Sequence, residues 1–230
     1  MSSIVAPSGV VSFRVGRSGT YTATPAKELS LLEIARHGLP WPGNPAEVNW
    51  WRLRNFPNLL RGLWRVLFAR FFGVAHFYGQ LSLAVIRRDG TILDYGLASL
   101  RVVTNNGVNF IVDAFQNTTE VENLKFHGIG TTNTAENQTD TALAAELTTV
   151  YNPDNTRATG STTEGASANI YRTVGTNTVD GSAAIVEHGI FSQAATGGGT
   201  LLDRSVFSTV NLANGDSLQS TYDLTFAANG

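Results

Sequence analysis

Cysteine is absent from the 230-residue chain, which excludes disulfide bonds and metal sites with cysteine ligands. Lysine is nearly absent, with Lys27 and Lys125 the only two. Charged residues make up 15% of the chain, against about 25% in ordinary soluble domains. A free cytosolic enzyme usually needs more surface charge for solubility, so this deficit favours a protein that is packed against neighbours.

Long apolar runs are also missing. No uncharged apolar stretch of about 20 residues occurs, so we expect no membrane span. Residues 1–15 lack the basic-then-apolar layout of a signal peptide, and we expect the protein to stay where it is made until assembly. Hydrophobic residues nevertheless reach 42%, which is enough to build a core.

Common catalytic motifs are missing from the sequence. The run Gly16-Arg17-Ser18-Gly19 fails the spacing of a nucleophile elbow, and neither a phosphate-binding loop nor a His-Glu-x-x-His helix is found. We therefore expect no enzyme activity and no cofactor. A hydrolase whose catalytic residues are dispersed along the sequence is the remaining enzymatic alternative.

Two histidines share a local pattern, Phe126-His127-Gly128-Ile129 and Glu187-His188-Gly189-Ile190. On neighbouring strands, His127, His188 and Glu187 could bind zinc. The preferred interpretation is two similarly built strand ends whose histidines are hydrogen-bonded near a glycine bulge. We therefore expect no metal site.

Charge is unevenly divided along the chain. Residues 1–101 hold 12 Lys+Arg and 5 Asp+Glu, a net +7, and residues 102–230 hold 4 and 13, a net −9. The sum is the overall −2. A basic half joined to an acidic half indicates partners of opposite charge, or one half docking on the other half of a neighbouring copy. The basic half is rich in bulky apolar residues and poor in lysine, so direct nucleic-acid binding is not expected.

Composition divides the chain into residues 1–75, an N-terminal arm that ends in an amphipathic helix, and residues 76–230, a β-domain. Residues 1–48 carry Gly, Ser and Pro and predict an extended arm, with two helical turns possible at residues 29–35. A helix is predicted over residues 58–72, with Asn58 as N-cap and Gly73 as the C-terminal stop.

The predicted helix has one wide apolar face with arginines beside it. Three interpretations stay open: packing on the chain's own β-domain, docking in a groove of a partner protein, and lying on a membrane surface. The docking interpretation is preferred because Trp and Arg are the types that anchor interfaces. The predicted partner-binding residues are Trp50, Trp51, Arg52, Arg54, Leu60, Arg61, Leu63, Trp64, Arg65, Leu67, Phe68 and Phe71.

Residues 76–230 read as β-structure. Asp89-Gly90 between apolar runs predicts a hairpin with a type I′ turn, and Asn214-Gly215 predicts another hairpin turn. Residues 218–226 alternate apolar and polar, which predicts a half-buried antiparallel strand. Short helices are predicted at residues 108–115 and, less strongly patterned, at 140–147. The fold class is therefore mainly β, an antiparallel β-sandwich or jelly-roll-like domain with one or two short helices.

Several strings of the β-domain are distinctive: residues 102–104 (VVT), 107–116 (GVNFIVDAFQ), 152–158 (NPDNTRA), 185–192 (IVEHGIFS), 198–208 (GGTLLDRSVFS) and 214–218 (NGDSL). They resemble a family of tailed-bacteriophage structural proteins, of the capsid cement or decoration kind. The resemblance covers roughly residues 80–230 and implies location in the virion, without a particular chemistry.

Together these features predict a virion structural protein that binds and stabilises the capsid shell as a cement protein, through apolar and basic contacts of its N-terminal arm. Its expected partners are the major capsid protein or other virion proteins, and a homo-oligomer is expected. The alternatives are a tail, baseplate or fibre-attachment component, and a host-surface-binding module with Tyr151 and Tyr171 as its few aromatic candidates.

Overall fold

The computed structural model of the protein describes residues 14–15, 21–22, 38–71, 76–120 and 123–227. Most of the arm expected at the N-terminus, including the helical turns at 29–35, lies outside these ranges, as do Phe72 and Gly73. The elements are β1 (Arg14–Val15), β2 (Tyr21–Thr22), α2 (Ala46–Phe71), β3 (His76–Ile86), β4 (Ile92–Val102), α3 (Asn105–Phe115), β5 (Phe126–Gly130), β6 (Ala158–Thr159), β7 (Thr163–Glu164), β8 (Ile170–Thr178), β9 (Ala183–Phe191), β10 (Leu201–Leu212) and β11 (Ser217–Ala227).

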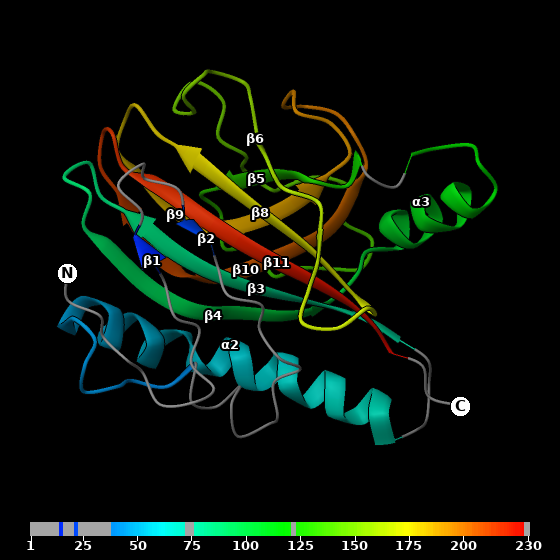
Figure 1. The fold of residues 1–230 in the computed structure, drawn as a ribbon, viewed down its shortest axis with the longest axis horizontal. Helices are drawn as coiled ribbons and strands as arrows, with labels where there is room; N and C mark the ends of the chain where they lie inside the picture. Colours follow the sequence, from blue (N-terminus) through cyan, green and yellow to red (C-terminus); the bar gives the residue numbers. More distant parts are fainter. Residues whose placement is uncertain (1–13, 16–20, 23–37, 72–75, 121–122, 228–230) are drawn as a thin grey trace.

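Two antiparallel sheets form a β-sandwich (Figure 1). One sheet has the strand order β4-β3-β11-β8-β7 and the other β10-β9-β5-β6. Leu81, Leu83 and Val85 point inward from β3 with the period of two that a strand imposes, and they meet Ile185 and Phe207 from the other sheet. The predicted mainly-β sandwich is thereby confirmed, while the jelly-roll assignment stays a prediction.

The hairpin predicted at Asp89-Gly90 is confirmed, because β3 and β4 are antiparallel neighbours. Its turn type is not the predicted one. Gly90 has a φ of +85°, but Asp89 is not among the described residues with positive φ. The amide of Gly90 bonds to the carbonyl of Arg87 and the amide of Arg87 to that of Thr91, both at 2.8 Å. This pattern fits a type I turn followed by a left-handed glycine, which replaces the predicted type I′ turn.

Asn214-Gly215 forms a turn, but the predicted hairpin at this point is wrong. The strands on either side, β10 and β11, belong to different sheets, so the turn carries the chain across the sandwich. Gly215 takes a φ of +86°, and its amide bonds to the carbonyl of Val179 at 2.8 Å. A glycine turn of this kind signals a reversal of the chain and does not specify which strand becomes the neighbour.

The strand predicted at 218–226 lies in β11, and Leu218, Tyr222 and Leu224 are buried as expected. Most of its polar face is buried as well, contrary to the half-buried pattern: Gln219, Asp223 and Thr225 are buried and Thr221 is half-buried. Asp223 on that face makes a two-point ion pair with Arg172 of β8, with both N–O distances 2.6 Å.

The helix predicted at 108–115 corresponds to α3, whose N-cap Thr104 accepts a 3.0 Å hydrogen bond from the amide of Gly107. No helix forms over the described residues 140–147, and that prediction is wrong. Leu143 and Leu147 are buried, but they belong to an irregular segment that passes beside β5.

The amphipathic helix begins at Ala46, twelve residues before the predicted start at residue 58. Asn58 is thus an interior residue and not an N-cap. Pro57 lies inside the helix on its exposed side, where the carbonyl that loses its amide partner can turn to water. α2 packs along β4 and touches β10, so it covers the side of the sandwich where the two sheets come together (Figure 1).

Candidate interaction surface

The inner face of α2 is fixed to the sandwich by polar as well as apolar contacts. The indole nitrogen of Trp51 donates to the carbonyl of Ser208 at 2.7 Å, and its ring meets Tyr95 edge-on at 4.9 Å between centroids. Arg52 donates to the carbonyls of Tyr95 and Asp94 at 3.1 and 3.2 Å. Trp51 and Arg52 therefore belong to the chain's own core, which corrects their assignment as partner-binding residues.

The close approach of α2 to β4 depends on a small residue. A β-carbon added at Gly62 would collide with the carbonyl of Leu100. One turn earlier, Leu59 is buried in a cluster with Leu97 and Leu100, and Leu63 packs partly against it. The inner face is thus closed over most of its length, which agrees with the interpretation that this helix packs on its own domain.

The outer face of α2 carries a second apolar stripe. Trp50, Leu53, Leu60 and Trp64 lie 61%, 52%, 43% and 67% exposed. With Pro57 they follow the alternating three- and four-residue spacing that places side chains in one line along a helix and is used for helix–helix contact. The helix is therefore apolar on two opposite sides, and only one of them is covered by its own domain.

Three arginines accompany this outer stripe. Arg54, Arg61 and Arg65 are exposed, and none makes an ion pair within the described part of the chain. Glu47 at the start of the helix is already paired with Arg87 at 2.8 Å. We name the surface formed by Trp50, Leu53, Arg54, Leu60, Arg61, Trp64 and Arg65 the α2 outer face. It is apolar along the stripe and positive along one edge, because at 100° per residue the three arginines follow the same flank.

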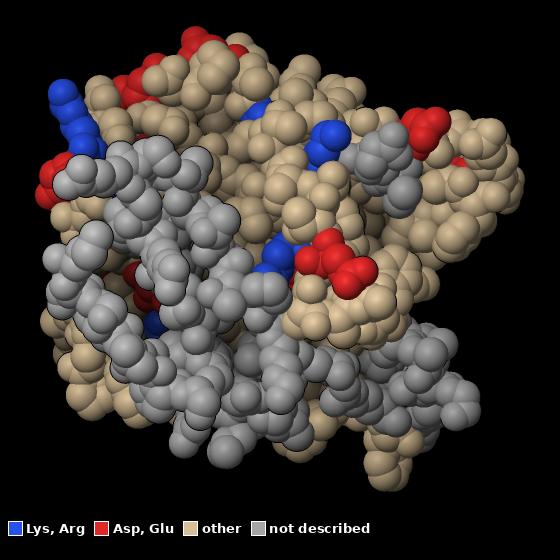
Figure 2. Space-filling view, viewed as in Figure 1, with Lys and Arg blue, Asp and Glu red and all other residues tan. Residues whose placement is uncertain are grey.

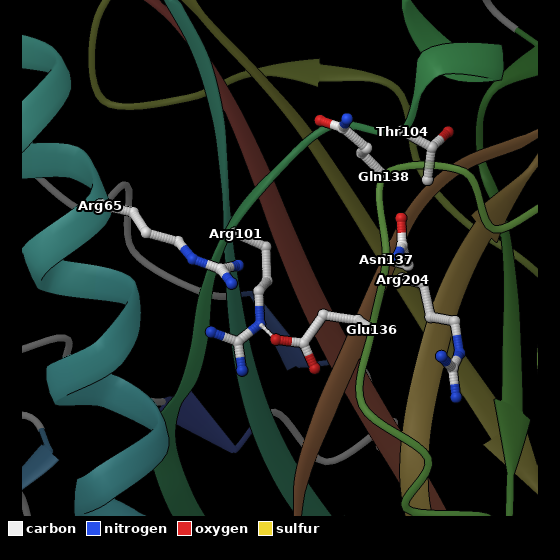
Figure 3. A pocket seen from close by; sticks show the side chains of 7 residues that line it. All are labelled: Arg65, Arg101, Thr104, Glu136, Asn137, Gln138 and Arg204. Carbon is white, nitrogen blue, oxygen red and sulfur yellow. Dashed lines mark ion pairs between the residues drawn. The ribbon is translucent and has the colours of Figure 1, made fainter.

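A polar cavity of about 380 Å³ opens beside Arg65 (Figure 3). It is lined by Arg65, Arg101, Thr104, Glu136, Asn137, Gln138 and Arg204. Arg101 is buried and pairs with Glu136 at 2.7 Å. Burial lowers the pKa of Arg101, and Arg65 and Arg61 act in the same direction against the attraction of Glu136. Arg65 reaches from α2 toward Arg101 and has no acidic partner among the described residues, so the cavity mouth suits an acidic group.

The histidines of the repeated pattern do meet, because β5 and β9 pair antiparallel with Gly128 opposite Gly189. His127 Nδ1 lies 3.0 Å from His188 Nε2, and His127 Nε2 lies 3.0 Å from the hydroxyl of Thr173. Both rings are fully buried, and burial lowers the pKa of His127 to about 3 and that of His188 well below its ordinary value. The two rings are thus held neutral as a hydrogen-bonded core pair.

Glu187 does not join the histidines. Its carboxylate accepts from the amides of Ala144 and Ala145 at 3.1 and 2.7 Å and pairs with Arg204 at 2.7 Å. Within the described residues, no group of three or more His, Asp or Glu side chains could hold a metal ion. The geometry of these residues supports the structural interpretation of the pair, in which His127 and His188 are hydrogen-bonded side chains of neighbouring strands.

Most of the predicted partner-binding residues lie on the outer side of α2. Exposed are Trp50, Arg54, Leu60, Arg61, Trp64, Arg65, Phe68 and Phe71; half-buried are Leu63 and Leu67; buried are Trp51 and Arg52. The prediction omitted Leu53, which completes the outer stripe. The three- and four-residue spacing from Trp50 through Pro57 to Trp64 indicates this stripe in the sequence. It is interrupted when Pro57 is interpreted as a helix boundary.

Comparison with protein-family models, curated proteins and solved structures finds no match for this chain. No helix among the described residues is long and apolar enough to cross a membrane.

Proposed function

We propose that this protein is a non-enzymatic structural component of a large assembly, of the capsid cement or decoration kind, and that it docks on another polypeptide through the α2 outer face. The observation that carries the proposal is the second apolar side of α2. Monomeric domains rarely leave a continuous apolar strip of tryptophan and leucine in water unless a partner covers it.

The contact would be stabilised mainly by apolar burial. Each large side chain that goes from exposed to fully buried contributes about 1.5–3 kcal/mol. The four exposed apolar residues of the outer face then supply several kcal/mol before the cost of association, which is consistent with a contact repeated many times over a shell. Arg54, Arg61 and Arg65 along one edge favour a partner surface with acidic groups.

The resemblance of residues 80–230 to tailed-bacteriophage structural proteins supports a place in the virion. A tail, baseplate or fibre-attachment component shares that place, and copy number per particle separates it from a cement protein. A host-surface-binding module gains no support from its tyrosine candidates: Tyr151 is buried and bonds to Ile129, and the hydroxyl of Tyr171 donates to the carbonyl of Leu124 at 2.9 Å.

The direct test is the binding of surface variants to purified particles that carry the protein. Removing residues 1–75 would also take Val48 and Trp51 out of the core, so point variants are cleaner. Leu60→Ser with Trp64→Ser should abolish co-sedimentation while the circular dichroism stays unchanged. Trp41→Ser, which removes a 58% exposed tryptophan outside the helix, serves as the matched control.

Two results would reject the proposal. Wild-type binding by the Leu60/Trp64 double variant would show that the outer face is not the contact. A copy number of a dozen or fewer by gel densitometry would reject the cement role and favour a tail component. Binding to lipid vesicles, but not to particles, would favour the membrane-surface interpretation of the helix.

A further inference from the structure

A second apolar surface lies between α3 and the sheets and is formed by residues that follow α2 in the sequence. It is a groove of about 420 Å³ lined almost entirely by carbon atoms, with Ile111, Phe115, Leu124, Tyr171, Leu202 and Leu224 among its walls. The hydroxyl of Tyr171 is already bonded to Leu124, so its ring contributes only apolar surface. Phe115 is 81% exposed at the C-terminal end of α3.

The groove exists because α3 is attached to the sandwich at one end. Thr104 donates to the carbonyl of Leu201 at 2.6 Å, and its amide donates to that of Leu202 at 2.9 Å. Gly107 lies so close to the backbone of Leu202 that an added β-carbon would collide with it. Farther along, the helix projects beyond the sheets (Figure 1), and its inner side chains are left beside an open space.

Acidic residues lie around this groove. Glu164 is two residues beyond Thr162, which lines the groove, and is in register with Tyr171 on the next strand. Glu120 lies in the segment between α3 and Leu124. Both are exposed and neither makes an ion pair in the described ranges. Lys125 is the basic residue nearest to Glu120 in sequence, and Arg172, on the strand beside Glu164, is already paired with Asp223. Figure 2 shows acidic side chains beside α3 and nearer the centre of the view, with basic side chains close to them.

We propose that the α2 outer face of one copy docks in the α3 groove of a second copy. A convex apolar stripe with arginines along one edge would meet a concave apolar groove that has Glu164 and Glu120 on neighbouring segments, so shape and charge are complementary. This inference rests on the proposed function, since it names the partner of the same outer face. The two surfaces differ, so the contact is head-to-tail, and repetition gives a closed ring or an open chain of copies.

The test uses two full-length variants, each of which destroys one surface. Trp64→Ser removes an exposed side chain of the stripe, and Phe115→Arg removes an exposed side chain of the groove and repels the arginines. Sedimentation velocity should show a concentration-dependent oligomer for the wild type. Each variant alone should associate about thirtyfold or more weakly, as for an interface hot spot. Trp41→Ser and Gln116→Arg, at exposed positions outside the two surfaces, should sediment like the wild type.

Mixing the two variants decides the geometry. Each retains the surface that the other has lost, so an equimolar mixture should form a dimer and nothing larger. A mixture that stays monomeric, or a Phe115→Arg variant that still oligomerises, overturns the groove as the docking site. If self-association fails in this way while Trp64→Ser still abolishes particle binding, the proposed function stands with another partner. If Trp64→Ser binds particles normally, the proposed function fails irrespective of the oligomer.

Discussion

Asn55 joins the two sheets through α2, and its replacement by leucine tests whether the helix is part of the folded core. The side chain is fully buried. Its amide nitrogen donates to the carbonyl of Ala98 in β4 at 2.7 Å, and its oxygen accepts from the amide of Ser208 in β10 at 3.0 Å. One side chain thus satisfies one backbone group from the outer strand of each sheet.

Leucine keeps the branching of the side chain at Cγ but is bulkier, and it leaves both backbone groups without a partner. An unsatisfied buried polar group costs about 1–3 kcal/mol, so two of them should reduce the free energy of unfolding by about 3 kcal/mol. In urea the unfolding midpoint should fall by about 1 M or more, with an unchanged slope. Leu53→Ala, at an exposed position on the same helix, is the matched control and should stay within about 0.5 kcal/mol of the wild type.

A midpoint for Asn55→Leu equal to that of the wild type would refute the reasoning, because α2 would then contribute no bonded contact to the sandwich. A changed slope would show that the native or the unfolded state had altered its compactness, and that result would leave no hydrogen-bond energy to assign.

Three further predictions concern buried and exposed side chains. Trp51→Ala should lower the unfolding free energy by about 3–5 kcal/mol in urea, whereas Trp64→Ala should change it by less than about 0.5 kcal/mol; equal losses would contradict the two-faced helix. Because the pKa values of His127 and His188 are lowered in the folded state, this state binds fewer protons than the unfolded state. The free energy of unfolding should therefore fall as the pH drops below about 6.5, by up to about 1.4 kcal/mol per pH unit for each ring. Burial raises the pKa of Asp203 to about 7, so between its ordinary pKa and pH 7 this carboxyl opposes the loss of stability caused by the histidines. Asp203→Asn should therefore steepen the decrease of the urea midpoint with falling pH. An unchanged decrease would contradict the raised pKa of Asp203. Arg157→Met should cost about 3–5 kcal/mol in urea, because it leaves Glu146 and the carbonyls of Gln193 and Gly198 without their buried donor; a neutral result would show that these acceptors reach water.

Local patterns predicted the elements that local interactions decide. The period of two marked β11, the glycine after Asp89 marked the β3–β4 hairpin, and the spacing of Ile111 and Phe115 marked α3. The turn at Asn214-Gly215 was also visible. Its role as a crossing between sheets was not, because strand neighbours are selected by packing far along the chain.

The start of α2 at Ala46 could not be predicted because a proline inside the helix conflicts with the apolar residues that precede it. Pro57 normally marks a helix boundary, and the packing of Val48 and Trp51 into the core outweighs its cost of about 3 kcal/mol. The polar contacts that fix the core were likewise hidden: Asn55 meets Ser208, and His127 meets Thr173, across large separations in sequence. The residue types were apparent, but their partners depend on the register of strands.

The two outermost strands away from α2, β6 and β7, have two residues each. A further strand can add to a sheet only where a row of free amides and carbonyls serves as a template, and so short an edge offers almost none. Together with the exposed carboxylate of Glu164 on β7, these short edges offer a second molecule few positions at which it could continue either sheet.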